Sequence, residues 1–175
     1  MPQIIRKDRI EEDGWTLLRP AADVEIATVE LPATPILVPL ALWQARREEL
    51  LARATPVSVW LAANENPSAI ADDLARLPLI AVDFPKFTDG RGYSIARSLR
   101  DRHGYRGEIR AIGDVQRDQL HYMRRCGFDA FAVRADHDIE RALAGLKSFS
   151  DSYQAAVDEP LPLFRRRAQA SGAAA

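Results

Sequence analysis

The chain has 175 residues, of which 47% are hydrophobic and 28% charged, a composition typical of one soluble globular domain. Its net charge of −1 is unevenly spread, because residues 1–82 sum to −4, residues 83–134 to +4 and residues 135–175 to −1. A local excess of this size is too small for a general nucleic-acid binder, no apolar run approaches the roughly 20 residues of a membrane span, and the single Cys126 excludes a disulfide framework.

The first third of the chain predicts a β-hairpin followed by extended structure. Asp13-Gly14 is a favoured turn pair, with IIRKDRI before it and WTLLR after it. Residues 20–38 are punctuated by prolines and predict an extended segment, with an edge strand near residues 24–29. Residues 40–54 have an apolar stripe opposite charged residues, which predicts an amphipathic helix.

From residue 57 the sequence alternates apolar runs, which predict strands, with helically periodic segments. Asn66-Pro67 is a helix start signal, and Asp114 is placed to cap the third helix. The predicted strands are 57–62, 77–84, 107–113 and 128–133. The predicted helices are 66–76, 93–103, 115–126 and a last one that begins at Asp136 or Asp138 and runs to about residue 156.

This alternation predicts an α/β fold with a parallel sheet of four or more βα units and an N-terminal β-hairpin. Two architectures remain open at this point, a partial TIM-like barrel and an open doubly wound sheet. We expect one domain over residues 1–160, with residues 1–38 as a hairpin and extended appendage, and a flexible tail over residues 161–175. Exposed sheet edges favour a homodimer, and the charged N-terminus without an apolar signal segment predicts a cytoplasmic protein.

The long loop after the second predicted strand is the main candidate for a functional site. Ligands of such sheets bind at the carboxyl ends of the strands, and this loop is longer than the usual two to six residues. Glycines before a helix allow backbone N–H groups to approach an anion, and nearby cations add charge. The predicted binders of a small anion (phosphate, sulfate or a carboxylate) are Lys86, Gly90, Arg91, Gly92, Arg110 and Asp114, with Asp83 and Asp89 as candidate catalytic acid–base groups. The alternative is that these glycines only form turns and that Asp89 caps the helix.

Arg110 and Glu108 share one face of their predicted strand, where charged groups are costly unless they are paired. They are either groups of a site inside a barrel or a structural ion-pair network with Asp83 or Arg134. Asp114, Asp118 and His121 align on the next helix, but a solvated face explains them better than a metal, so we predict no metal site. No sequence motif for a flavin, a nucleotide, an iron–sulfur cluster or a haem is evident.

Several sequence blocks resemble one bacterial family, catalogued as domain of unknown function 934. They are FPKFTDGRGYSIARSLR (84–100), GYRGEIRAIGDV (104–115), DQ (118–119), RCGFDAF (125–131), SFSDSYQAA (148–156) and the Phe-Arg-Arg sequence that begins at Phe164. The resemblance covers at least residues 83–167.

Members of that family are usually encoded beside assimilatory sulfite reductase and are named as oxidoreductases of sulfite reduction. The resemblance therefore implies an accessory protein of reductive sulfate or sulfite assimilation, with sulfite reductase as its partner, that supports the enzyme by binding or by assisting electron transfer. It implies no catalytic residues, and with no redox-cofactor motif in the chain it leaves open whether the protein is an enzyme. The alternatives are a small (βα) enzyme acting on an anionic metabolite and a purely interaction-based module.

Overall fold

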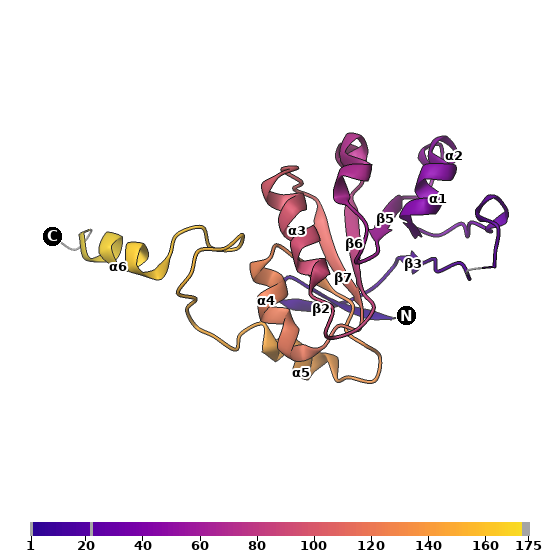
Figure 1. Cartoon of the computed structure of the whole chain (residues 1–175). Helices are drawn as coiled ribbons and strands as arrows, with labels where there is room; N and C mark the ends of the chain where they lie inside the picture. Colours follow the sequence, from indigo (N-terminus) through magenta and orange to yellow (C-terminus); the bar gives the residue numbers. More distant parts are fainter. Residues whose placement is uncertain (1, 22, 173–175) are drawn as a thin grey trace.

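One mixed sheet of eight strands forms the centre of the protein, whose structure is a computed structural model that describes residues 2–21 and 23–172 (Figure 1). The strand order is β2-β1-β8-β7-β6-β5-β4-β3. Strands β3 to β8 pair in parallel, whereas β1 is antiparallel to both β2 and β8. The strands are β1 (Gln3–Arg6), β2 (Arg9–Glu12), β3 (Thr16–Leu17), β4 (Ile36–Pro39), β5 (Val57–Leu61), β6 (Leu79–Phe84), β7 (Glu108–Gly113) and β8 (Ala130–Phe131).

The sheet is strongly curled. Its two edge strands, β2 and β3, are joined directly: β2 ends at Glu12 and β3 begins at Thr16. Four residue steps reach about 14 Å at most. A flat sheet of eight strands would hold its edges about 34 Å apart, since neighbouring strands are about 4.8 Å apart. The short connection therefore requires the edges to approach each other, and the α/β prediction is confirmed as a curled, mostly parallel sheet.

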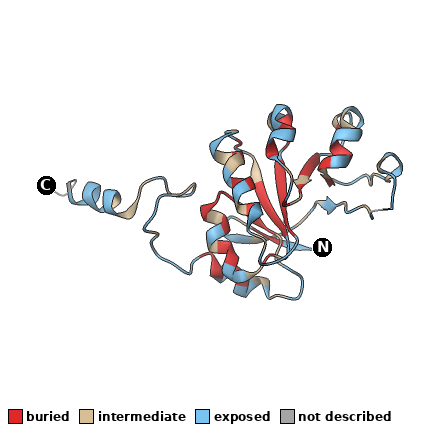
Figure 2. Ribbon diagram, in the orientation of Figure 1, coloured by how far each residue is buried: buried red, intermediate tan, exposed pale blue. Residues whose placement is uncertain are grey.

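The two faces of the sheet have different contents, because alternate residues of each strand point to opposite sides. The outer face carries the main apolar core, in which Val59, Ile80 and Val82 pack beneath the helices (Figure 2). The inner face has a smaller apolar cluster with Leu37 and Ala81, together with buried polar residues. The helices of the outer face are α1 (Leu40–Ala45), α2 (Arg47–Leu51), η2 (Pro67–Arg76), α3 (Arg91–Asp101), α4 (Leu120–Arg125) and α5 (Ile139–Gly145).

The N-terminal hairpin is present, but its predicted turn was wrong. The strands 3–6 and 9–12 pair with each other, so the chain turns at Lys7-Asp8, where Lys7 has a φ of 56°. Asp13-Gly14 begins the connection to β3 instead. The long-range pairing of β1 with β8 and the burial of Ile5, which is 0% exposed, override the local preference of an Asp-Gly pair for a turn.

The structure confirms the four strands predicted from residue 57 onward and adds β4, which pairs with β5 inside the segment expected to be extended. The predicted edge strand at 24–29 is wrong, since residues 26–28 form the short 3₁₀ helix η1. The predicted helix over residues 40–54 is divided at Arg46, whose φ of −126° and ψ of 29° are not helical. Tertiary packing of two apolar segments onto the strands, not periodicity, sets where these helices end.

The predicted helix start at Asn66 is confirmed, because its side chain accepts the backbone N–H of Ser68 at 2.9 Å. The predicted cap at Asp114 is wrong: helical structure begins later, with η3 (Arg117–Gln119), and Gln116 forms a capping box with Gln119. The last predicted helix starts at Asp138 but ends at Gly145 rather than near residue 156.

Beyond α5 the chain forms a C-terminal arm, residues 147–172, that ends in helix α6 (Leu163–Gly172). In Figure 1 this helix stands away from the rest of the protein, on the side opposite α1 and α2. The sequence pattern did not predict α6, and residues 173–175 of the expected tail lie outside the described residues. Within the described part of the chain, no helix has the length and apolar character needed to cross a membrane.

Candidate functional site

Asp83, the second-to-last residue of β6, lies on the inner face of the sheet, where it is 7% exposed. Arg19 Nη2 lies 2.5 Å from Asp83 Oδ1, and the Arg19 guanidinium also lies 4.9 Å from the centre of the Trp60 ring. Trp60 is fixed in turn by donating its indole N–H to Leu18 O at 2.9 Å. The sequence analysis identified Asp83 but missed Arg19, because no local signal links residues 64 positions apart.

Arg91 and Asp89 form an ion pair where the loop after β6 meets α3. Arg91 donates to Asp89 through Nε at 2.9 Å and Nη2 at 2.6 Å, and its backbone N–H also bonds Asp89 at 3.1 Å. These bonds lower the pKa of Asp89 to about 2, the side-chain bonds of Arg91 being the largest cause. Asp89 is therefore ionised at neutral pH and a weak base, while the exposed Lys86 lies on the same loop.

The two glycines of this loop have separate structural roles. A Cβ at Gly92 would lie 2.6 Å from the ring of Phe84, so the glycine permits close packing of α3 on β6. At Gly90, the N-cap of α3, the nearest atom to an added Cβ would be 3.7 Å away, an ordinary contact. The absence of a side chain at Gly92 thus allows the helix backbone to approach the core ring of Phe84 closely.

Asp114, the residue after β7, joins three loops at the carboxyl ends of the strands. Its side chain accepts the backbone N–H of Phe87 at 2.9 Å, the Gln116 amide at 2.9 Å and Arg134 Nη1 at 2.8 Å. The pKa of Asp114 is lowered, first by the bond from Gln116 and then by that from Phe87. Arg134 also bonds Asp136, so its charge is already engaged by two carboxylates.

Arg110 is 0% exposed and lies in the interior of the curled sheet. Its Nη1 contacts both carboxylate oxygens of Asp13 at 2.9 Å, and its Nε donates to Glu108 Oε1 at 2.9 Å. Glu108 also accepts from Arg6 Nε at 2.7 Å, and Arg6 binds Glu11. Arg110 Nη2 lies 2.9 Å from Glu108 Oε1, but the geometry of this contact is not that of a hydrogen bond.

The predicted anion binders thus occupy different places. Arg110 is inside the sheet with Asp13 and Glu108, Arg91 is paired with Asp89 at the loop, and Asp114 is paired with Arg134. An anion at the loop would have to compete with Asp89 for Arg91. Anion binding and acid–base catalysis by these residues stay predictions.

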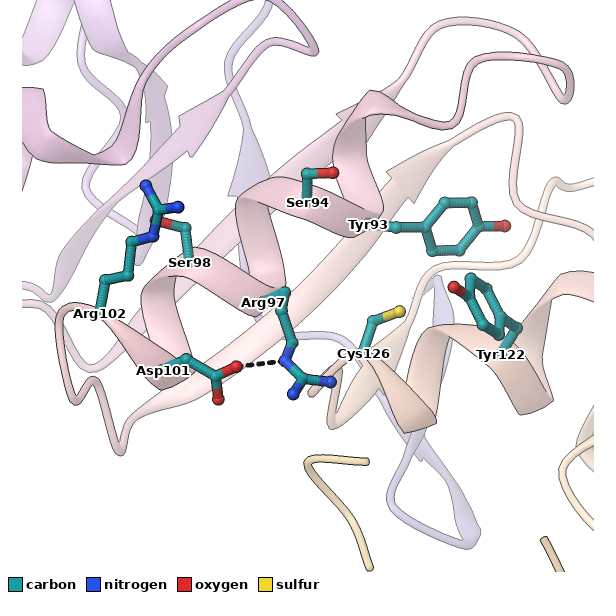
Figure 3. A pocket seen from close by; sticks show the side chains of 8 residues that line it. All are labelled: Tyr93, Ser94, Arg97, Ser98, Asp101, Arg102, Tyr122 and Cys126. Atoms are coloured by element: carbon teal, nitrogen blue, oxygen red, sulfur yellow. Dashed lines mark hydrogen bonds and ion pairs between the residues drawn. The ribbon is translucent and has the colours of Figure 1, made fainter. Parts of the chain in front are cut away.

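A groove of about 490 Å³ lies between α3 and α4 (Figure 3) and is lined by Tyr93, Arg97, Arg102, Tyr122 and Cys126 among others. Burial raises the pKa of the Cys126 thiol, so the sulfur is protonated at neutral pH. Within residues 2–21 and 23–172, no group of three or more His, Cys, Asp or Glu side chains is placed to hold a metal ion.

The C-terminal arm carries three exposed aromatic side chains. Phe149, Tyr153 and Phe164 are 64%, 65% and 57% exposed. The arm is fixed to the body where Val157 N–H bonds Arg125 O at 3.1 Å and where Arg125 Nη1 lies 3.2 Å from Asp158.

Comparison with known proteins gives a match to one family model, described as "Bacterial protein of unknown function (DUF934)", over residues 58–164. The matched region begins in β5 and extends into α6, so it includes the loop of Asp89 and the groove between α3 and α4. No curated protein matches the chain.

Proposed function

The chain belongs to this family of bacterial proteins of unknown function, and from that premise we propose that it is a cytoplasmic accessory protein of reductive sulfate or sulfite assimilation that binds sulfite reductase. The pathway and the partner come from the family resemblance of residues 83–167. A binding role agrees with the state of the carboxylates, since Asp83 and Asp89 are each held by an arginine.

The observation that carries the binding role is the C-terminal arm. Exposed aromatic side chains are enriched where proteins dock, and Phe149, Tyr153 and Phe164 lie exposed within a short stretch of chain. Arg165 lies 5.9 Å from the Phe164 ring and is exposed, as is Arg167, so the arm combines apolar and positive surface. Such a surface suits an acidic partner face.

Co-purification with sulfite reductase tests the proposal. The full chain should retain the reductase on a column, and the double variant Tyr153→Ala/Phe164→Ala should retain much less. Phe87→Ala is the matched control, because Phe87 is also exposed (42%) but lies at the strand ends, away from the arm. Retention by the double variant equal to that of the full chain would contradict docking through the arm.

A genetic measurement tests the pathway independently of the docking surface. Deleting the gene should impair growth on sulfate or sulfite and leave growth on cysteine unchanged. Normal growth on all three sulfur sources would contradict a role in sulfite reduction. If the chain assists electron transfer to the reductase, the co-purified complex should show a flavin or haem absorbance that the isolated chain lacks.

The alternative function is a small (βα) enzyme acting on an anionic metabolite, and the buried polar groups of the inner face favour it. Asp83 and Arg110 are buried on the inner side of the curled sheet, and Asp83 lies next to the carboxyl end of β6, the end of the strands where barrel enzymes carry catalytic groups. For this alternative we also propose that the curled sheet is a partial TIM-like barrel with its helices on the outside. Sulfite- or phosphate-induced thermal stabilisation that Arg91→Ala abolishes would favour the enzyme over the accessory protein.

A further inference from the structure

The groove between α3 and α4 lies on the helical face of the protein, and its lining includes none of the residues that the sequence analysis assigned to a site (Figure 3). Its volume of about 490 Å³ is within the range of small-molecule sites. The two tyrosines lie at one end, Arg102 lies at the other, and Arg97 lies between them on the side of α3 that faces α4. The groove therefore has an aromatic end and a cationic end.

The aromatic end is held in a fixed geometry. The Tyr93 and Tyr122 rings meet edge to face, with centroids 5.0 Å apart, and Tyr93 packs in turn on the buried Phe84 at 5.2 Å. Tyr122 is nevertheless 57% exposed. An exposed ring whose orientation is already fixed by its neighbours can stack on a planar ligand at little cost in side-chain entropy.

The net positive charge of residues 83–134 is exposed at the cationic end of the groove. Most arginines of this region are engaged, including Arg91, Arg100, Arg110 and Arg134. The side chain of Arg102 forms none of the hydrogen bonds or ion pairs found among the described residues, and its guanidinium lines the edge of the groove beside Ser98.

Among the residues that the structure describes, the Arg97 side chain pairs only with Asp101, one turn further along α3, and about half of each side chain is exposed. An exposed pair of this kind contributes little and yields to a ligand anion. Ser98 adds a hydroxyl donor beside Arg102, and Ser94, one helical turn earlier on α3, lies nearer Tyr93. Two cations against one carboxylate leave this end of the groove positive.

We propose that this groove binds a planar aromatic anion of about the size of a nucleoside monophosphate, with the ring on Tyr122 and the anionic group at Arg102, Arg97 and Ser98. The helical rise places Tyr93 and Ser98 about 7.5 Å apart along α3, a span that a sugar bridges between a base and its phosphate. The inference does not depend on a role in sulfur assimilation, because it uses only the lining of the groove.

Calorimetric titration of the full chain with AMP, adenosine and inorganic phosphate tests it. AMP should bind more tightly than adenosine or phosphate, because only AMP occupies both ends of the groove. Tyr122→Ala and Arg102→Ala should each weaken AMP binding at least fivefold, and Tyr122→Phe should retain it, since stacking needs the ring and not the hydroxyl.

Arg106→Ala is the matched control, since Arg106 also forms no ion pair among the described residues but lies outside the groove. It should leave AMP binding unchanged. The inference is overturned by absence of AMP binding, by phosphate binding as tightly as AMP, or by an equal loss in Arg106→Ala. Circular dichroism checks that each variant is folded. The variants should fold because residues 102, 106 and 122 are exposed.

Discussion

Replacing Arg110 by methionine should destabilise the protein by about 3 kcal/mol, because it leaves a carboxylate without a cation inside the sheet. Methionine keeps much of the buried side-chain volume, so the effect of the lost charge is separated from that of a cavity. Removing one partner of a buried ion pair costs about 3–5 kcal/mol. The side chain of Asp13 is 14% exposed, and that of Glu108 is 17% exposed and keeps Arg6 at 2.7 Å, so the lower end of that range applies.

The measurement is urea unfolding followed by circular dichroism, with a melting curve in support. For a chain of this length, 1 kcal/mol corresponds to about 2–4 °C, so the melting temperature should fall by about 6–12 °C. The double variant Arg110→Met/Asp13→Asn should recover much of the loss, because it removes the unpaired charge and keeps an acceptor for the Trp15 N–H. Arg97→Met is the control for an exposed ion pair and should change the stability by less than about 0.5 kcal/mol.

Two results would refute this reasoning. If Arg110→Met is as stable as the unmodified protein, the interior network does not stabilise the fold, and a functional reason for the buried arginine gains support. If the double variant is less stable than the single variant by the full cost of another lost pair, the two residues act independently and their 2.9 Å contact carries no coupling.

Gly92→Ala should destabilise the protein by about 1–3 kcal/mol in urea unfolding, because its Cβ would lie 2.6 Å from the Phe84 ring. Gly90→Ala, where the nearest atom is 3.7 Å away, is the matched control, and equal losses in the two variants would rule out this packing reason. The Asp89 carboxyl should titrate near pH 2 by NMR, and Arg91→Ala should raise its midpoint toward the ordinary value. Because the folded-state pKa is depressed, the stability that this pair contributes is fully present above about pH 4 and is lost as the pH falls toward 2. An ordinary aspartate midpoint in the unmodified protein would contradict the pairing.

The strand-and-helix alternation from residue 57 onward followed from the sequence, because continuous apolar runs and helix start signals are local properties. The run LIAVDF became β6, buried along its whole length, and Asn66 began its helix as its side chain predicts. Helix ends were predicted less well. The break at Arg46 and the end of α5 at Gly145 depend on which apolar side chains reach the sheet, and periodicity alone does not encode that.

The candidate site likewise contains residues that the sequence identified and residues that it did not. The sequence identified the residues at the strand ends, and it identified Arg110 and Glu108 as a pair that needs partners. It did not identify Asp13 for Arg110, 97 residues away, or Arg19 for Asp83. It grouped Lys86, Arg91 and Arg110 as binders of one anion, whereas folding pairs Arg91 and Arg110 with different acids and leaves Arg102 exposed in a groove between two helices.

The sequence by itself therefore determined the fold class, the family and the positions of the strands from residue 57 onward, since these depend on periodicity and on local motifs. Only the tertiary structure decided how the sheet curls, which charges neutralise each other and which remain available to a ligand. The physical reason is that a buried charge is stabilised by whatever partner the fold brings within about 3 Å, and the curled sheet brings Asp13 to Arg110 and Arg19 to Asp83 across long stretches of chain.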